Sequence, residues 1–303
     1  MSSVFYFYRK IEPMKTLRIL GVPEHFNYPF RLLEQEQPFA DRGVKIQWTD
    51  ESRGSGQMNL ALRNDETDIS ILLTESFLKD YEAGNPSKMI GFHVATPLTW
   101  GIHIGSKSTS NSLSDLGKKH FLVSRMGSGS HLMAMVLAKR EGWNHRDLSY
   151  EIVGNMDGAK AAMDAGNEGL FLWEKYTTAP MVSNGTMMRI GEVPSPWPCF
   201  VMVASDKALE EFGALIFELR NKVYEISKAL MNNPDRVDTL ASYYSLDRND
   251  VKKWLTQTTW STEAKVSKSE LEQAIETMKE LGIINEKLSL ENFLTSNSLT
   301  IGV

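Results

Sequence analysis

The chain has 303 residues, 42% of them hydrophobic, so it can bury a large core and is long enough for two lobes. Its net charge of −5, with both signs mixed along the sequence, argues against nucleic acid as a partner. The single cysteine, Cys199, excludes an internal disulfide framework and any cysteine-rich metal or iron–sulfur site.

The N-terminus lacks the order of a secretory signal, in which charges precede about 7–15 apolar residues. Residues 4–8 are apolar, and the charges of Arg9 and Lys10 follow them. No stretch approaches the roughly 20 apolar residues that cross a bilayer. We therefore expect no leader and no membrane span, a cytoplasmic location, and an appended tail at residues 1–14.

Apolar runs and amphipathic periods predict strands that alternate with helices from residue 17 onward. In the first part, the expected strands are residues 17–22, 45–48, 68–73, 89–94 and 100–104. After a Ser/Thr/Asn-rich stretch, they are residues 120–123, 149–153, 169–173, 187–191 and 199–204. The expected helices begin at residues 30, 58, 74, 131 and 158. Beyond Ser205 four segments have a helical period, residues 209–232, 234–244, 248–256 and 268–281, whereas residues 282–303 give no clear signal.

This alternation predicts parallel βαβ units, and hence an α/β protein with two parallel-dominated sheets flanked by helices. Proline and aromatic residues lie beside a strand in two passages, near 97–104 and 194–201. We expect these to be hinge crossings between a second lobe, residues 105–199, and a discontinuous first lobe, residues 15–104 and 200–303. The C-terminal helices are expected to pack on the first lobe.

Two Gly/Ser turns each connect a strand to the helix that follows it. Such a turn leaves the first backbone N–H groups of its helix unpaired and directed beyond the strand end. Glycine lets a ligand approach the backbone, and serine adds hydroxyl donors and acceptors. The pair predicts that two lobes hold one small polar molecule, whereas two ordinary βα turns with good N-caps are the structural alternative. The residues concerned are Arg53, Gly54, Ser55, Gly56, Gly127, Ser128, Gly129, Ser130 and His131.

The second turn is the better candidate for an anion, because Arg125 and the titratable His131 flank its helix N-terminus. Its spacing matches neither the P-loop nor the dinucleotide-binding glycine pattern. A nucleotide ligand is therefore disfavoured.

Further candidates lie at strand ends or in the hinge passages, where open α/β sheets bind ligands. Thr74 and Glu75 follow the third strand, and a carboxylate there favours an amine-bearing ligand. A zwitterion, or a heteroaromatic amine with an acidic group, reconciles this carboxylate with an anion site. Each candidate also has a structural alternative as a solvated turn, a helix cap or lobe packing. The remaining candidates are Phe26, Asn27, Trp100, Asn155, Trp173, Glu174 and Trp197.

Catalytic patterns are absent from the sequence: it has no His-Glu-x-x-His, no Gly-x-Ser-x-Gly and no Cys/His pair of plausible spacing. Its six histidines are scattered. We therefore predict no catalytic residue, metal site or cofactor, and a small molecule as the partner. Whether the chain has a protein partner is left open by the sequence.

Four segments carry a resemblance to a known family: residues 96–105, 113–117, 122–132 and 172–177. With this element order, the chain resembles the type II periplasmic-binding-protein fold, in the branch of nitrate, sulfonate and taurine receptors and thiamine pyrimidine-precursor proteins. It is similar in particular to a leaderless, cytosolic member described in yeasts and their bacterial relatives. The resemblance implies a two-lobed protein that closes on a small anionic or zwitterionic metabolite, sulfonate-like or thiamine-precursor-like, without altering it.

An enzyme of the thiamine-pyrimidine-synthase type, acting on a bound pyridoxal-phosphate-like molecule, is the alternative that the same resemblance implies. The chain departs from that branch, because its one cysteine cannot supply a cysteine-rich iron motif. The lysine that would carry pyridoxal phosphate has no identifiable position in this sequence. The resemblance therefore supports binding more than catalysis.

Overall fold

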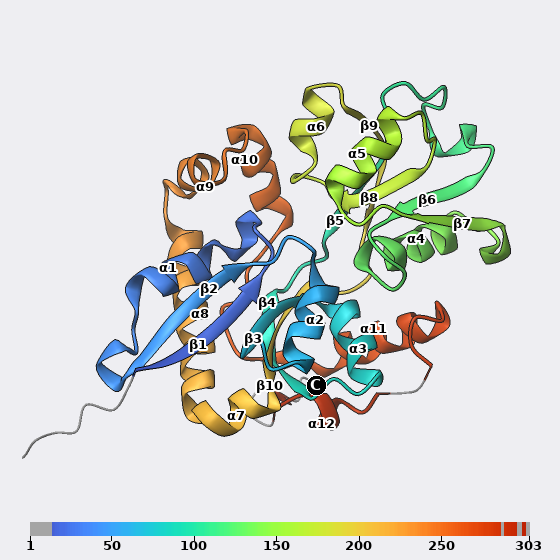
Figure 1. Ribbon diagram of the computed structural model, residues 1–303. Coiled ribbons are helices and arrows are strands. Elements are labelled where there is room, and N and C mark those ends of the chain that lie inside the picture. Colours follow the sequence, from blue (N-terminus) through green and yellow to red (C-terminus); the bar gives the residue numbers. More distant parts are fainter. Residues whose placement is uncertain (1–13, 286–287, 296–298, 301–303) are drawn as a thin grey trace, which may run out of the picture.

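The computed structural model describes residues 14–285, 288–295 and 299–300, so most of the expected tail at 1–14 lies outside the described residues. Two five-stranded sheets form two lobes (Figure 1). The first sheet has the order β2-β1-β3-β10-β4 and the second has the order β7-β6-β8-β5-β9. A sheet of two short strands, β11 (Val266–Ser267) and β12 (Leu299–Thr300), lies near the C-terminus.

The first sheet is parallel except for one strand. Strand β1 pairs in parallel with β2 and β3, whereas β10 runs antiparallel between β3 and β4. Its strands are β1 (Lys15–Gly21), β2 (Val44–Asp50), β3 (Ile69–Leu73), β4 (Ser87–Val94) and β10 (Phe200–Ser205).

The second sheet repeats this plan, with β5 as its one antiparallel strand. Its strands are β5 (Thr99–Gly105), β6 (Lys119–Val123), β7 (Leu148–Ile152), β8 (Leu170–Glu174) and β9 (Met187–Pro194). The expectation of two parallel-dominated sheets is confirmed.

In each sheet the antiparallel strand directly follows a crossing between the lobes. Strand β5 pairs with β8 and β9, so residues 99–104 belong to the second lobe, whereas the sequence analysis assigned them to the first. The first crossing is therefore residues 95–98, and the second is residues 195–199. The sequence of an apolar strand beside a crossing does not show which sheet the strand will join. The predicted boundary between the lobes was therefore placed after this strand instead of before it.

Helices flank both sheets. On the first lobe the early helices are α1 (Tyr28–Glu36), α2 (Ser55–Arg63) and α3 (Thr74–Glu82). On the second lobe they are α4 (Gly129–Arg140), α5 (Met156–Asp164) and α6 (Ala179–Ser183). Short 3₁₀ turns are η1 (His25–Asn27), η2 (Ala40–Arg42), η3 (Leu113–Asp115) and η4 (His145–Asp147).

The C-terminal region is helical, as expected, and packs mainly on the first lobe, where α8 contacts α1 and α11 contacts α3. The helix expected at 209–232 is interrupted at Gly213, whose φ of 51° lies in the left-handed region and ends α7. Its helices in the described part of the chain are α7 (Asp206–Phe212), α8 (Ala214–Asn232), α9 (Arg236–Tyr244), α10 (Arg248–Gln257), α11 (Lys268–Glu280) and α12 (Leu290–Phe293).

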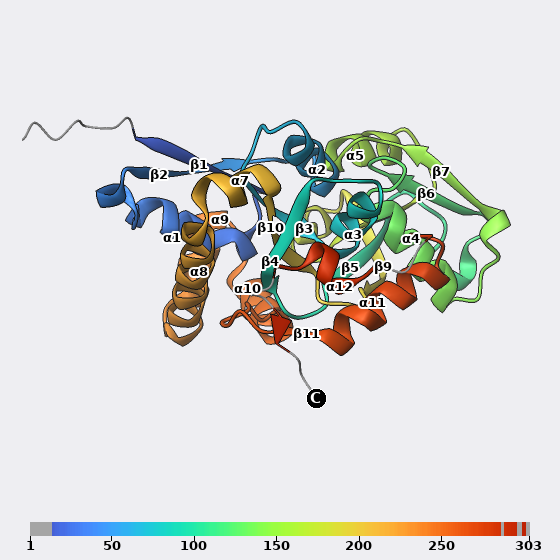
Figure 2. The same ribbon diagram turned by 90° about the horizontal axis from the view of Figure 1, so that it is seen from below.

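This helical extension also reaches the second lobe. The Tyr176 hydroxyl donates to Oε1 of Gln257 on α10 at 2.8 Å. On the face shown in Figure 2, α11 lies beside α4, and Lys139 pairs with Glu280 at 2.6 Å. The C-terminal helices therefore connect the two lobes in addition to the two chain crossings.

The second crossing is held to the first lobe by a buried carboxyl group. The indole N–H of Trp197 donates to Oε2 of Glu75 at 2.6 Å, and the Thr74 hydroxyl donates to the Pro198 carbonyl at 2.6 Å. Burial raises the pKa of Glu75 to about 7. Thr74, Glu75 and Trp197 were predicted ligand contacts, but their polar groups hold the hinge and they do not line the interlobe cavity.

This burial predicts a pH dependence of folding. Folding raises the pKa of this carboxyl from 4.5 to about 7, so the protein's free energy of unfolding decreases as pH rises between those values. We expect Glu75→Gln, which keeps an acceptor for Trp197, to be more stable than wild type at pH 8 by up to about 3 kcal/mol. The two proteins should be equally stable near pH 4.5, as measured by urea unfolding.

The exposed Glu210 on α7 offers the matched control. Glu210→Gln should follow the wild-type curve at both pH values. A Glu75→Gln protein that is less stable than wild type at pH 8 would contradict the proposed state of this carboxyl group.

Candidate ligand-binding cleft

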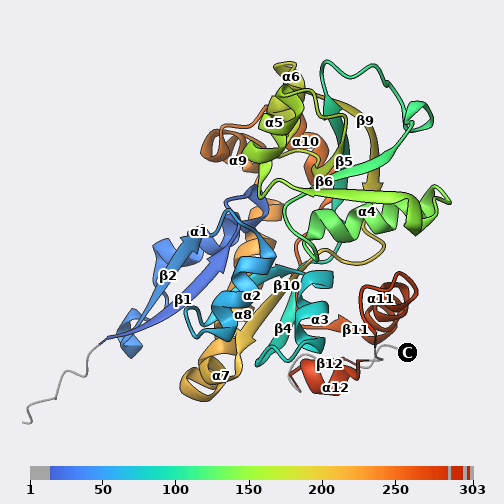
Figure 3. The same cartoon turned by 45° about the vertical axis from the view of Figure 1, so that its right-hand side comes forward.

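The two Gly/Ser turns line one cavity of about 60 Å³ between the lobes. In Figure 3, α4 of the second lobe lies above α2 and α3 of the first, and α3 and α4 are in contact. The cavity brings together more than half of the predicted ligand residues, although their role in binding stays a prediction. These are Arg53, Gly54, Ser55, Gly56, Trp100, Ser128, Gly129, Ser130, Trp173 and Glu174.

The first turn connects β2 to α2. Gly54 occupies the N-cap position with a φ of 81°, which favours glycine, and no side chain caps this helix. The Ser55 hydroxyl accepts from the backbone N–H of Leu73 at 3.0 Å and so joins the start of α2 to the end of β3. The Arg53 guanidinium pairs with Glu51 at 2.6 Å, which neutralises much of its charge.

The serines of the second turn are partly occupied by the fold. Ser128 accepts from the backbone N–H of His131 at 3.4 Å and caps α4, while Ser130 accepts from Ser124 N–H at 3.0 Å. The two hydroxyls are 3.0 Å apart. The structural alternative for this turn is thus correct in part, because the same serines cap the helix and line the cavity.

Glycine is needed in both turns because the lobes approach closely there. A Cβ at Gly129 would stand 2.6 Å from Cδ1 of Leu73, on the opposite lobe. A Cβ at Gly56 would stand 1.0 Å from Nη2 of Arg125, also on the opposite lobe. Larger residues at either position would separate the lobes or displace Arg125.

Two carboxyl groups, one from each lobe, line the cavity. Oε2 of Glu174 accepts from the backbone N–H groups of Tyr176 at 2.9 Å and Thr177 at 2.6 Å. Glu24 precedes η1 on the first lobe, and burial and the charge of Glu174 hold its pKa well above the usual range. Burial likewise raises the pKa of Glu174. One proton is therefore readily retained by this pair, and the two carboxyl groups favour a cationic or N–H-bearing group in the cavity.

Aromatic and aliphatic side chains form the rest of the wall. Trp173 stacks on Phe171, with ring centroids 5.3 Å apart. Trp100 is 5% exposed, and its indole N–H has no acceptor among the described residues. A buried donor without a partner is costly, so an acceptor on a ligand would satisfy it.

Five other predicted contacts lie outside the cavity. The Phe26 carbonyl accepts from His93 and Trp260, and the Asn27 amide donates to the Val22 carbonyl at 2.8 Å. These two residues therefore hold the first strand and η1 in place.

The other three belong to the second lobe. Gly127 donates its N–H to Nδ1 of His131 at 3.1 Å, and burial and Lys79 lower the pKa of His131 to about 4. This lowered pKa favours a neutral His131 imidazole near pH 7. Asn155 caps α5 by accepting from Gly158 N–H at 3.0 Å.

Several wall residues were missed by the sequence analysis. Most of them lie at or just beyond the ends of strands. Thr74 and Glu174 were predicted from that same position, so considering every residue at a strand end would have found most of the wall. They are Val22, Glu24, Leu73, Leu98, Ser124 and Phe200, together with Arg125, which was noted only as part of the second turn.

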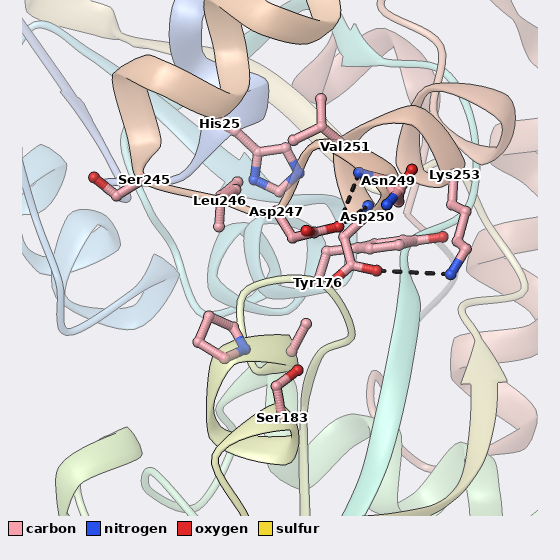
Figure 4. A pocket seen from close by; sticks show the side chains of 12 residues that line it. His25, Tyr176, Ser183, Ser245, Leu246, Asp247, Asn249, Asp250, Val251 and Lys253 are labelled. Carbon is pink, nitrogen blue, oxygen red and sulfur yellow. Dashed lines mark hydrogen bonds and ion pairs between the residues drawn. The ribbon is translucent and has the colours of Figure 1, made fainter.

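A larger crevice of about 510 Å³ lies between α6 and the α9–α10 region (Figure 4). Several of its polar groups have partners: Oδ1 of Asp247 accepts from the Asn249 and Asp250 N–H groups, and Lys253 lies 3.8 Å from Asp250. Nε2 of His25, by contrast, has no hydrogen-bond partner among the described residues. None of the predicted ligand residues lines it. We therefore regard the smaller interlobe cavity as the candidate site.

Within residues 14–285, 288–295 and 299–300, no three His, Cys, Asp or Glu side chains are grouped to hold a metal ion. Over the same residues, no helix combines the length and apolar character needed to cross a membrane.

Comparison with known proteins identifies the fold. Residues 100–193 match a family model described as Ca3427-like PBP. The Candida albicans CA3427 gene product, described as having the generic periplasmic binding protein fold, is 23% identical, with 94% of this chain and 96% of that chain covered and a TM-score of 0.82. No protein with a curated description matches the chain.

Two other solved structures have the same fold. The alkanesulfonate-binding protein SsuA from Xanthomonas axonopodis pv. citri, bound to MOPS, is 17% identical, with 96% and 100% coverage and a TM-score of 0.74. A ligand-binding component of an ABC-type import system from Staphylococcus aureus, with zinc bound, is 14% identical, with 94% and 98% coverage and a TM-score of 0.74. The chain therefore has the two-lobed type II periplasmic-binding-protein fold that its sequence resembles, and its neighbours include sulfonate-binding proteins.

The carboxyl pair leads to a prediction about proton binding. In Glu174→Gln, the pKa of Glu24 should fall because the neighbouring negative charge is lost, yet stay above its usual value because burial persists. Carbon-13 NMR titration of the Glu24 side-chain carboxyl measures this change. In the control Glu168→Gln, at an exposed position of the same lobe, the Glu24 titration should not move. An unchanged Glu24 pKa in Glu174→Gln would show that the two groups are not coupled.

Proposed function

We propose that this chain is a solute-binding protein whose lobes close on a small polar metabolite in the interlobe cavity and do not alter it. The main observation is that both Gly/Ser turns, two carboxyl groups and Arg125 line one cavity from opposite lobes. The fold that the chain shares with ligand-binding components of transport systems supports the same function.

The lining residues favour a ligand with groups of both polarities. Arg125 and the start of α2, which no side chain caps, suit an anionic group. Glu24 and Glu174 suit an amine or a ring N–H, and Trp100 and Trp173 suit a flat body. A zwitterion, sulfonate-like or resembling a thiamine pyrimidine precursor, meets these requirements, and the Xanthomonas neighbour's bound MOPS is consistent with a sulfonate.

Closure is the step that would give affinity. Contact between Gly129 on the second lobe and the Leu73 side chain on the first removes water from the cavity walls. Charge-assisted hydrogen bonds are stronger in such a dry site than in solvent. Ligand binding and lobe closure would therefore stabilise each other.

The enzymatic alternative has less support. Chemistry of the pyridoxal-phosphate type needs a lysine in the site, and no lysine lines the described part of the cavity. The expected cytoplasmic location remains a prediction, which fractionation of the native host would test.

Native mass spectrometry of freshly purified protein tests the binding function directly. We expect a noncovalent small-molecule adduct that is released unchanged on unfolding. Small-angle scattering should show that the stripped protein becomes more compact when the released molecule is returned. The absence of both an adduct and compaction, or release of a chemically altered molecule, would contradict the proposal.

The unpartnered indole N–H gives a prediction for one side chain. Trp100→Phe keeps an aromatic wall but removes the donor, so affinity for the co-purified molecule should fall about tenfold, the effect of one hydrogen bond. Isothermal titration calorimetry measures this loss. Trp143→Phe, at a half-buried tryptophan outside the cavity, is the control and should bind as wild type does. Equal affinity in Trp100→Phe would exclude the indole from the site.

A further inference from the structure

Two cationic side chains cross the gap between the lobes in opposite directions. Lys79, on α3 of the first lobe, places Nζ 3.4 Å from where a Cβ of Gly127 would stand on the second lobe. Arg125, on the second lobe, lays its guanidinium against Gly56 at the start of α2 on the first. Gly127 and Gly56 both belong to the Gly/Ser turns, so each cation lies against the backbone of the opposite lobe.

Neither cation has a hydrogen-bonding or ion-pair partner among the described residues. The acidic side chains nearest in the chain are engaged elsewhere. Asp80 accepts from Arg63 Nε at 2.9 Å and from the Asn85 amide at 2.7 Å. Glu82 accepts from the backbone N–H of Asn285 at 2.7 Å. Glu82 still attracts Lys79 and Asp80 attracts Arg125, but neither carboxylate forms an ion pair with these cations among the described residues.

Partial burial increases the free-energy cost of holding the two cations without hydrogen-bonding partners. Lys79 and Arg125 are both half-buried, so each has lost part of its hydration. Burial, followed by the charge of Arg125, lowers the pKa of Lys79. Burial also lowers the pKa of Arg125. Like charges held together in a desolvated gap are unfavourable unless an anion lies between them.

We propose that Lys79 and Arg125 form an anion subsite at the edge of the interlobe cavity, which takes a tetrahedral oxyanion, the phosphate or sulfonate group of the ligand. This inference rests on the proposed function and specifies its ligand. Arg125 lines the cavity and Lys79 does not. The oxyanion would therefore lie toward the Lys79 side, and the amine-bearing end would lie between Glu24 and Glu174.

The subsite also explains how binding would hold the lobes together. A sulfonate or phosphate-ester group has three terminal oxygens, enough to accept from the guanidinium and the ammonium at once. Because the two cations belong to different lobes, the oxyanion would bridge them and replace their repulsion by two attractions. With the lobes apart, each lobe would present only its own cation to the oxyanion.

The test uses inorganic phosphate and methanesulfonate as probes on the full chain stripped of small molecules. Calorimetry in low-salt buffer should show that wild type binds at least one of the two. Lys79→Gln and Arg125→Gln should each weaken that binding by about fivefold to tenfold, and the double variant should abolish it. Lys252→Gln, at an exposed lysine on α10, is the matched control and should bind as wild type does.

The same variants separate a binding role from a structural one. Because neither cation has a partner, both single variants should unfold at the wild-type temperature or above it without anion. At one probe concentration, wild type and Lys252→Gln should gain more thermal stability than either single variant, and the double variant should gain none.

Three results would overturn the inference: no binding of either probe to wild type, equal binding to Lys79→Gln, or marked loss of stability in the anion-free variants. If Lys79→Gln still becomes compact with the co-purified molecule at unchanged affinity, the subsite is wrong while the solute-binding function stands.

Discussion

The close contact between the two Gly/Ser turns is the constraint on which the cavity depends. Gly129 lies against Leu73 and Trp100, and Gly56 lies beneath the Arg125 guanidinium. At both points a Cβ would stand closer than 3 Å to the opposite lobe, so the lobes meet only because side chains are missing. The same contact exposes helix starts and hydroxyl groups to the enclosed space. The sequence feature that permits closure is thus also the one that supplies polar groups to the cavity.

The hinge follows from how the sheets are connected. Each sheet takes its antiparallel strand, β5 or β10, directly after a crossing, so both crossings are anchored by strand pairing at their ends. The buried Glu75 carboxyl and the Trp197 indole hold the second crossing against the first lobe. The C-terminal helices add the Tyr176–Gln257 and Lys139–Glu280 contacts between lobes. Closure therefore depends on pairing at the crossings and on polar contacts beside them.

Much of the fold could be predicted because its signals are local. Apolar runs, helical periods and turn residues indicate the strands and helices, and the two Gly/Ser turns indicate the cleft. Contacts between distant residues have no such signal. Nothing near Glu75 shows that Trp197, more than 100 positions away, donates to it. Likewise, the sequence does not show that Asn155 only caps a helix, or that Glu24 lies near Glu174. Cavity residues could be predicted where their position at a strand end is enough to identify them. They could not be predicted where the role of a side chain depends on a partner far away in the sequence.

Enclosure of a molecule between the two lobes requires that the lobes move relative to each other. Spin labels on cysteines introduced at Lys45 and Asp157, exposed positions on opposite lobes, would report this movement. The native Cys199 is 1% exposed and would not compete for the label. Electron–electron double resonance on the stripped protein, before and after its co-purified molecule is returned, measures the distance between the labels. We expect a shift to one shorter, narrower distribution, and an identical distribution in the two samples would contradict the account.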